Sequence, residues 1–267
     1  MHEILRNLPK GSLVLDLGCA TGSFPQNATD ATVVRIDRDR PSANASNFVQ
    51  ADASRLPFAD RTFDAVISNH SLEHFDDLPA ALREIRRVIS PNGALFVAVP
   101  DAGTLTDKLY RWLGRGGGHV NAFTSAGETA ALIESATGLR HVATRTLCSS
   151  LSFLNRRNSP RPIPRRLLLL GAGYEWSLFL YAWLSRRADR WLNTRTSVYG
   201  WAFYFGNIKE HIDTGTWVNV CMRCGAGSPV GVLRPRFRFP GLRIFRCPQC
   251  GAVNPFSSEA LSSASMT

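Results

Sequence analysis

Five short apolar runs, separated by polar stretches, constrain the fold of this 267-residue chain more than any other feature. They read LVLDLG (13–18), TVVRID (32–37), NFVQAD (47–52), FDAVISN (63–69) and ALFVAVP (94–100). Between the last two, residues 78–90 carry apolar side chains at helical spacing, and PNG (91–93) is expected to end that helix. Near-continuous apolar strands that alternate with helices predict a parallel sheet covered on both faces.

The first strand runs into a turn of small residues, VLDLGCATGSF (14–24). Its glycines, Gly18 and Gly22, follow a G-x-x-x-G spacing, whereas a dinucleotide fingerprint needs G-x-G-x-x-G. Glycine lets a backbone approach a ligand closely, and a helix that starts after such a turn can hold a carboxylate at its N-terminus. The turn therefore predicts a nucleotide-like cofactor, bound differently from the dinucleotides of the G-x-G-x-x-G fingerprint.

The stretch VLDLGCATGSF resembles the first motif of the class I S-adenosylmethionine-dependent methyltransferases. The resemblance continues in order through Asp37, QADASRLPF, FDAVISNHSLEHFDDL, SPNGALFVAVP and GHVNAFT, and it covers about residues 12–140. It is closest to the small-molecule, type 11-like branch. It implies an α/β, Rossmann-like sheet of seven strands in the order 3-2-1-4-5-7-6, with 139–148 as the sixth strand and 197–208 as the seventh.

The resemblance also implies a set of residues that bind S-adenosyl-L-methionine. Asp16 would reach the ammonium group, Asp37 the ribose hydroxyls and Asp52 the adenine amino group, and Asn69 would face the reactive methyl group. The backbone would contribute at Gly18, Cys19, Ala20, Gly22 and Ala53. Taken alone, Asp16 and Asp37 could instead cap helices.

Ala20 stands where this family more often has glycine. Alanine is tolerated there if its φ is negative. If φ is positive the residue is strained, and Ala20→Gly should raise the affinity for the cofactor.

Three histidines are candidate general bases for an acceptor that must lose a proton: His119, His70 and His74. Glu73 could orient one of them. SLEHF (71–75) could equally be a solvated helical turn, and a histidine by itself is weak support for a catalytic role.

The two parts of the chain differ in charge. Residues 1–150 carry 15 Lys and Arg against 16 Asp and Glu, whereas residues 151–267 carry 16 against 5. Such a basic segment favours a polyanionic partner. We expect residues 152–196 to be an inserted lid or contact region, in which the apolar run 167–184 is either a buried helix or an interfacial one. In the second case, residues 160–193 would touch an anionic membrane through Trp176, Trp183, Trp191 and the flanking arginines.

Two Cys-x-x-Cys pairs lie 22 residues apart near the end of the chain: Cys221, Cys224, Cys247 and Cys250. Each pair is followed by glycine, as in the two knuckles of a zinc ribbon. Four thiolates make a closed, structural Zn²⁺ site. The residues between the pairs should form ribbon strands, on which arginines and phenylalanines (234–246) either bind nucleic acid or form a solvated face.

These patterns divide the chain into five parts: a core (1–151), the insertion (152–196), the last core strand (197–210), the zinc ribbon (215–256) and a disordered tail (257–267). No apolar stretch of secretory length precedes the first strand, which predicts a cytoplasmic protein, peripheral at the inner membrane face if 160–193 binds lipid.

The acceptor would be a small or lipid-linked molecule. An RNA methyltransferase that uses the ribbon, and a non-catalytic cofactor-binding assembly protein, are the alternatives.

Overall fold

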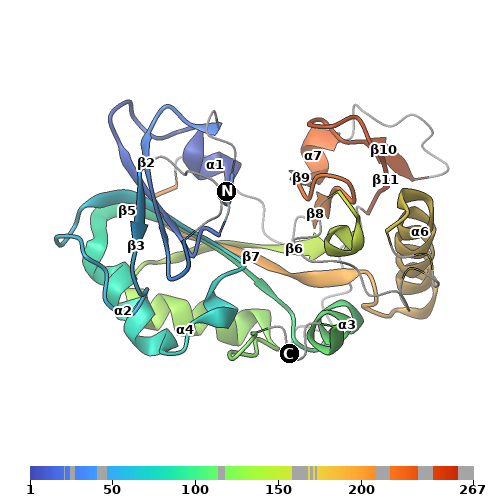
Figure 1. Ribbon diagram of the computed structural model, residues 1–267, viewed down its shortest axis with the longest axis horizontal. Coiled ribbons are helices and arrows are strands. Elements are labelled where there is room, and N and C mark those ends of the chain that lie inside the picture. Colours follow the sequence, from blue (N-terminus) through green and yellow to red (C-terminus); the bar gives the residue numbers. More distant parts are fainter. Residues whose placement is uncertain are drawn as a thin grey trace. The chain divides into compact units, whose positions relative to one another are not determined.

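The computed structural model describes residues 1–20, 22–24, 28–40, 47–113, 118–157, 168, 171, 173–208, 217–233 and 243–257 (Figure 1). The chain forms two compact units. The first comprises Met1–Ala102, Arg111–Thr144 and Trp201–Thr214, and the second comprises Gly103–Tyr110, Arg145–Gly200 and Gly215–Thr267. The predicted tail from 258 onward lies outside the described residues.

The first unit is built on a parallel sheet. Its strands are β1 (Leu13–Leu17), β2 (Thr32–Asp37), β3 (Phe48–Gln50), β4 (Phe63–Asn69) and β5 (Ile89–Pro100). Strand β1 pairs in parallel with both β2 and β4, and β3 and β5 extend the sheet on either side. With β6 (His141–Cys148) and β7 (Val198–Gly206) the order is 3-2-1-4-5-7-6, which confirms the predicted topology.

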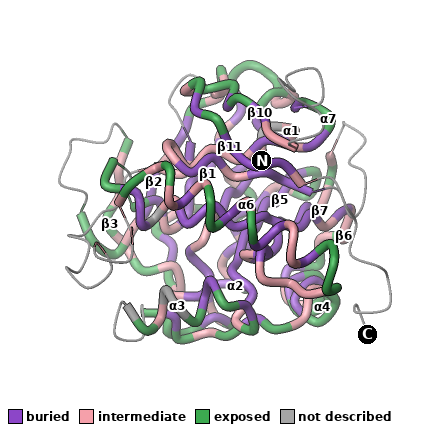
Figure 2. Tube along the Cα trace, turned by 90° about the vertical axis from the view of Figure 1, so that its right-hand side faces the viewer, coloured by how far each residue is buried: buried purple, intermediate pink, exposed green. Residues whose placement is uncertain are grey.

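Two amphipathic helices, α2 (Leu78–Val88) and α4 (Ala126–Thr137), pack against each other in the first unit (Figure 1). Asp77 caps α2 by accepting from the Ala80 N–H, and Ser125 caps α4 by accepting from the Glu128 N–H. Their apolar faces join one core with β1, β4, β5 and β7, and Figure 2 colours β1 and β5 largely as buried. This core fixes the strand ends from which the candidate site projects.

Strand β5 begins at Ile89, directly after α2, instead of at residue 94. PNG (91–93) therefore lies inside the strand, and its predicted role as the stop of the helix is wrong. Ile89 pairs with Phe63 of β4 before the register shifts. Pairing with the neighbouring strand thus overrides the local turn signal. The short helix α1 (His2–Leu5) also belongs to the first unit, whereas most of α3 (Leu105–Leu113) belongs to the second.

The second unit contains the long helix α6 (Glu175–Leu192), the 3₁₀ turn η3 (Ser152–Leu154) and the cysteine pairs. Strand β8 (Trp217–Val220) pairs in parallel with β6 and antiparallel with β9 (Gly227–Pro229). The strands β10 (Ile244–Arg246) and β11 (Val253–Pro255) form a separate antiparallel hairpin. A second apolar core includes Cys148, Trp217, Phe245 and Phe256.

Two sequence expectations about this unit need correction. The apolar run 167–184 is not one helix, because α6 starts only at Glu175 and continues through Leu192. At Glu175 the carboxylate suits the positive N-terminal end of the helix dipole. The segment 225–246 is not all strand, since Val230–Leu233 form the short helix α7, and residues 234–242 lie outside the described residues.

Helix α6 is also not simply a buried core helix. It buries a narrow stripe around Leu178, Ala182 and Arg186. It exposes six large apolar side chains: Trp176, Leu180, Tyr181, Leu184, Trp191 and Leu192. Among the described residues, no helix is both long and apolar enough to cross a bilayer.

Candidate functional site

The turn after β1 is held against the end of β2. The N–H groups of Gly18 and Cys19 both donate to the Ile36 carbonyl, at 2.9 and 3.0 Å. The Gly22 N–H donates back to the Cys19 carbonyl and closes the turn. Gly18 has a φ of +68°, and a Cβ placed there would lie 2.4 Å from the Cβ of Ser71. Only glycine satisfies both constraints.

Asp16 is completely buried just before this turn. Its Oδ2 accepts the Ser23 N–H at 3.0 Å and lies 3.9 Å from the Arg35 Nε. Burial raises the pKa of the Asp16 carboxyl, and the Ser23 hydrogen bonds oppose that shift. Asp16 therefore fixes the far side of the turn from inside the sheet.

Asp37, the last residue of β2, is hydrogen-bonded to the turn from the other side. Its Oδ2 accepts the Ala20 N–H at 2.8 Å, and its Oδ1 accepts the Asp39 N–H at 3.1 Å. Ala20 has a φ of +45°, the left-handed conformation in which alanine is strained. Each carboxylate oxygen has a second lone pair, so Asp37 can still accept from ribose hydroxyls.

The loop after β3 lies beside Asp37. The Ala51 N–H donates to the Asp37 carbonyl at 3.1 Å, and this contact brings Asp52 and Ala53 to the same edge of the sheet. Asp52 is exposed, and its Oδ1 accepts the Ser54 N–H at 2.8 Å, which lowers the pKa of the Asp52 carboxyl. Asn69 ends β4 opposite Ala98 of β5.

The segment after β4 turns sharply. His70 has a φ of +56°, and Leu72–His74 form the 3₁₀ turn η2. The His70 Nδ1 lies 3.9 Å from the Glu73 Oε1. Burial lowers the pKa of His70 to about 4, and the neighbouring His119 and His74 add to that shift. His70 is therefore neutral near pH 7.

Residues 118–121 are fastened to this 3₁₀ turn. The N–H groups of Val120 and Asn121 donate to the Glu73 carbonyl at 2.8 and 3.0 Å. The Asn121 side-chain amide donates to the carbonyls of Leu72 and Phe75. The rings of His74 and His119 consequently meet edge to face, with centroids 4.8 Å apart. The structure thus brings together His70, His74 and His119, the three candidate bases, with Glu73.

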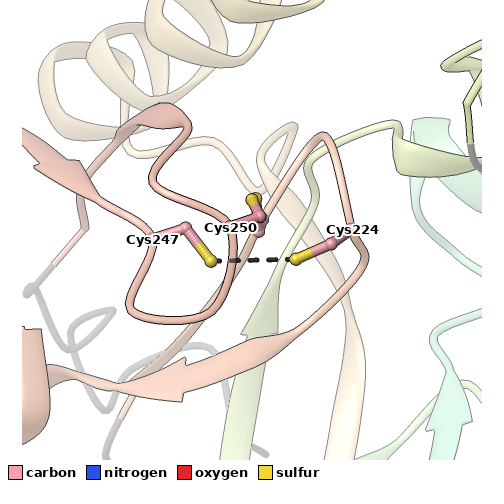
Figure 3. A group of neighbouring side chains, drawn as sticks. Cys224, Cys247 and Cys250 are labelled. Atoms are coloured by element: carbon pink, nitrogen blue, oxygen red, sulfur yellow. Dashed lines mark hydrogen bonds between the residues drawn. The ribbon is translucent and has the colours of Figure 1, made fainter.

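The four cysteines converge in the second unit. The sulfur atoms of Cys224 and Cys247 lie 3.7 Å apart (Figure 3), and those of Cys221 and Cys250 lie 3.6 Å apart. All four sulfur atoms lie within 4.8 Å of one another. A tetrahedral Zn²⁺ with Zn–S bonds of about 2.3 Å requires S···S distances of about 3.8 Å. The cluster therefore fits a four-thiolate metal site.

Each cysteine pair forms the same tight turn. The Gly225 N–H donates to the Cys221 carbonyl, and the Gly251 N–H donates to the Cys247 carbonyl. Both glycines have left-handed φ values, 72° and 71°. The Arg223 N–H points at the Cys221 sulfur at 3.4 Å, as expected of a knuckle that stabilises a thiolate.

Several residues that support the cysteine cluster were not identified from the sequence. The Asn254 amide donates to the Cys221 sulfur at 3.3 Å, and its Oδ1 accepts the Met222 N–H at 2.8 Å. Glu175 makes a bidentate ion pair with Arg223, at 2.8 and 2.6 Å. The spacing of the cysteines does not predict Glu175 as a partner. It predicts Asn254 only weakly, through its position four residues after Cys250.

Comparison with known proteins identifies the first unit. Residues 15–97 match the methyltransferase domain family. Over these residues the chain is similar to the class I S-adenosylmethionine-dependent methyltransferases. Its turn after β1, its acid at the tip of β2 and its sheet order follow the pattern that the sequence predicted.

The relatives of this methyltransferase domain cover only part of the chain. Malonyl-[acyl-carrier protein] O-methyltransferase of Erwinia pyrifoliae is 34% identical over 108 residues, which are 37% of this chain and 41% of the relative. The human mitochondrial arginine-hydroxylase NDUFAF5 is 34% identical over 115 residues, which are 39% of this chain and 32% of the relative. The chain thus spans less than half the length of each.

Among solved structures, a methyltransferase of Archaeoglobus fulgidus aligns with 76% of this chain and 88% of its own, at 17% identity and a TM-score of 0.48.

Proposed function

We propose that this protein transfers a methyl group from S-adenosylmethionine to a small-molecule or lipid-linked acceptor. The observation that carries the proposal is the contact between Asp37 and the Ala20 N–H, which locks the turn after β1 to the tip of β2. Both lie at the carboxyl ends of parallel strands, where open α/β sheets bind their ligands. Asp16, Gly18 and the loop carrying Asp52 and Ala53 border the same edge.

In the reaction, the acceptor attacks the methyl carbon in line with the C–S bond. The electron pair of that bond stays on sulfur, which becomes a neutral thioether, while a new bond joins the methyl group to the acceptor. An acceptor hydroxyl also loses its proton to a base. His70, His74 and His119 follow β4, next to Asn69, and are the candidate bases, while positioning of the two reactants supplies most of the acceleration.

Calorimetric titration with S-adenosylmethionine tests the cofactor site. We expect wild-type protein to bind, and Asp37→Ala to weaken binding by about a hundredfold, because charge-assisted hydrogen bonds to the ribose and the turn are lost. Asp39→Ala is the matched control, because Asp39 is exposed and only its backbone N–H contacts Asp37. The proposal is wrong if the wild-type protein does not bind.

The class of the methyl acceptor is supported only by the name of a relative. One relative is named as an O-methyltransferase of malonyl-[acyl-carrier protein], so the same domain type acts there on an acceptor held by a carrier. Transfer of a labelled methyl group from S-adenosylmethionine to carrier-bound acids, and to the same acids free in solution, would separate the two acceptor classes. The human relative named as a hydroxylase makes this direct assay necessary.

Helix α6 favours the second of the two alternatives for this segment, an interfacial helix that contacts an anionic lipid surface. Trp176, Leu180 and Leu184 follow one another at helical spacing and are 68%, 47% and 51% exposed. Trp191 is 73% exposed, and the Arg187 guanidinium lies 4.6 Å from the centre of the Trp183 ring. Aromatic rings beside arginines suit the headgroup layer of a membrane.

Sedimentation with vesicles tests this contact. We expect binding to vesicles that contain an anionic phospholipid, weaker binding to neutral vesicles, and loss of binding in the double variant Trp176→Ser and Trp191→Ser. Trp112→Ser is the control, because Trp112 is 70% exposed on α3. Equal sedimentation of the double variant and the wild type would rule out α6 as the contact.

The four-cysteine cluster is proposed to hold a structural Zn²⁺, since four thiolates leave no open coordination position. Of the arginines that would carry RNA binding, Arg234, Arg236 and Arg238 lie outside the described residues. Arg246 is exposed on β10, but the neighbouring Phe245 is buried and could not stack on a base, so the RNA alternative has weak support.

A further inference from the structure

A second group of side chains that could hold a metal ion lies in the first unit, well separated in sequence from the cysteines. Glu73, His74 and His119 each present one donor atom, and these atoms lie within 4.8 Å of one another. Glu73 is 1% exposed and His119 is 9% exposed. A buried carboxylate beside two imidazoles is a donor set typical of divalent transition metals.

Hydrogen bonds already hold the three side chains close together. Glu73 and His74 are consecutive in η2, and the Glu73 carbonyl accepts the N–H groups of Val120 and Asn121. Asn121 also binds the carbonyls on both sides of this segment, those of Leu72 and Phe75. His119 is therefore delivered to Glu73 and His74 by backbone contacts that would persist with or without an ion.

The tautomer of His74 is also defined. Its Nδ1 lies 2.9 Å from the Gly118 carbonyl oxygen. A carbonyl oxygen can only accept a hydrogen bond, so Nδ1 carries the hydrogen. The neutral ring then presents the lone pair of Nε2. A carbonyl that fixes the second nitrogen in this way is the usual outer partner of a metal-bound histidine.

We propose that Glu73, His74 and His119 bind a divalent transition-metal ion of the zinc or iron(II) class through one carboxylate oxygen and two imidazole nitrogens. Metal–ligand bonds of about 2.0–2.2 Å place the ligand atoms of a tetrahedral ion about 3.4 Å apart. The donor atoms, which lie within 4.8 Å of one another, would thus close in by up to about 1.4 Å, within reach of rotation of the side chains. Three protein ligands leave at least one coordination position open.

Through its open position the ion could bind the methyl acceptor. This role rests on the proposed methyl transfer. An acceptor oxygen bound there would be held beside η2, the 3₁₀ turn that follows β4, and an acceptor hydroxyl would lose its proton more readily. His74 and His119 would then be metal ligands, and His70 would remain as the candidate base. The Glu73–His70 distance of 3.9 Å keeps that ring next to the site.

Metal content per chain tests the proposal. Wild-type protein is saturated with Zn²⁺, dialysed against a weak chelator and analysed for metal. We expect about two ions per chain, one at the cysteines and one here. His119→Gln and Glu73→Gln should each retain about one. The control His141→Gln, whose ring in β6 contacts Thr144, should retain two.

Cobalt(II) spectra assign the second ion independently of any variant that folds poorly. Thiolate ligands give cobalt an intense sulfur-to-metal charge-transfer absorption, whereas nitrogen and oxygen ligands give only weak visible bands. As metal-free wild-type protein is titrated, we expect weak bands from a second cobalt ion after the thiolate absorption has saturated, or before it begins.

One ion per chain in the wild type, or two ions retained in both His119→Gln and Glu73→Gln, would overturn the proposal. Calorimetry with S-adenosylmethionine on metal-free protein keeps the two hypotheses separate. Cofactor binding without a second ion removes only the metal site, whereas a second ion without cofactor binding removes only the methyl transfer.

Discussion

At the scale of single residues, Ala20 shows how the turn after β1 is strained. Its φ of +45° belongs to the left-handed region, which costs an L-residue about 1–2 kcal/mol. Asp37 holds the Ala20 N–H, so the turn keeps this shape despite the cost. The sequence left two cases open for Ala20, and the positive φ selects the one in which Ala20→Gly should raise the affinity for the cofactor.

Ala20→Gly should relieve about 1 kcal/mol of strain. If the free turn relaxes, the gain appears as a cofactor affinity up to about fivefold higher; if not, it appears as a higher free energy of unfolding. Calorimetry and chemical denaturation measure the two. Ala20→Val should act in the opposite direction, because a β-branched residue is worse at positive φ. No change in either quantity for Ala20→Gly would show that the turn is not strained.

Gly18 is the second decisive residue. Gly18→Ala would bring a methyl group to within 2.4 Å of the Ser71 Cβ, while Ser71 is itself fixed by a hydrogen bond of its Oγ to the Leu17 carbonyl. We expect a loss of about 2–4 kcal/mol in unfolding free energy together with loss of cofactor binding. Gly11→Ala is the control, because its φ is also positive and nothing lies within 4 Å of an added Cβ. A similar loss in both variants would point to backbone strain and not to the close approach.

At the scale of elements, Arg87 of α2 holds the segment that connects β3 to β4 through hydrogen bonds. Its guanidinium donates to the carbonyls of Leu56 and Phe58 and to the carboxylates of Glu84 and Asp60. The Glu84 Oε2 in turn accepts the Leu56 N–H at 2.7 Å. This network positions the loop that carries Asp52 and Ala53.

Arg87→Ala should lower the free energy of unfolding by about 1–3 kcal/mol, since it leaves the loop carbonyls without these donors. It should also weaken cofactor binding by loosening the Asp52 loop. Denaturation and calorimetry provide the two measurements. Arg83→Ala, an exposed position on the same helix, should leave both within about 0.5 kcal/mol of the wild type. Equal effects of the two substitutions would contradict this role of Arg87.

At the scale of the whole molecule, the two units depend on different stabilising forces. The first has a continuous apolar core between its sheet and the helices α2 and α4. The second has a smaller core around the cysteines, supported by buried polar contacts such as that of Arg186 with Asn219. Small cores of this kind usually need a metal ion or another cross-link.

Removal of metal should therefore unfold the second unit selectively. After treatment with a strong chelator, we expect hydrogen exchange to accelerate over residues 217–257 while the strands β1, β4 and β5 remain protected. Cys247→Ser should give the same pattern without chelator. Unchanged protection of 217–257 after complete metal removal, verified by metal analysis, would show that the cluster does not stabilise this unit.

Local patterns in the sequence were sufficient for the sheet and for the four-cysteine cluster. Apolar runs of five to seven residues bury both faces of a parallel strand, so the positions of β1, β2 and β4 and the strand order followed from pattern and resemblance. The turn after β1 and the spacing of the four cysteines are equally local. Each needs particular residue types at fixed separations.

Tertiary packing alone decided the rest. The sign of φ at Ala20 depends on a hydrogen bond to Asp37, and the meeting of His119 with Glu73 and His74 depends on contacts made by Val120 and Asn121. The exposed apolar face of α6 and the bond from Asn254 to Cys221 could not be read from composition. Such features arise where distant segments pack together, and the sequence pattern within one segment carries no information about its partner.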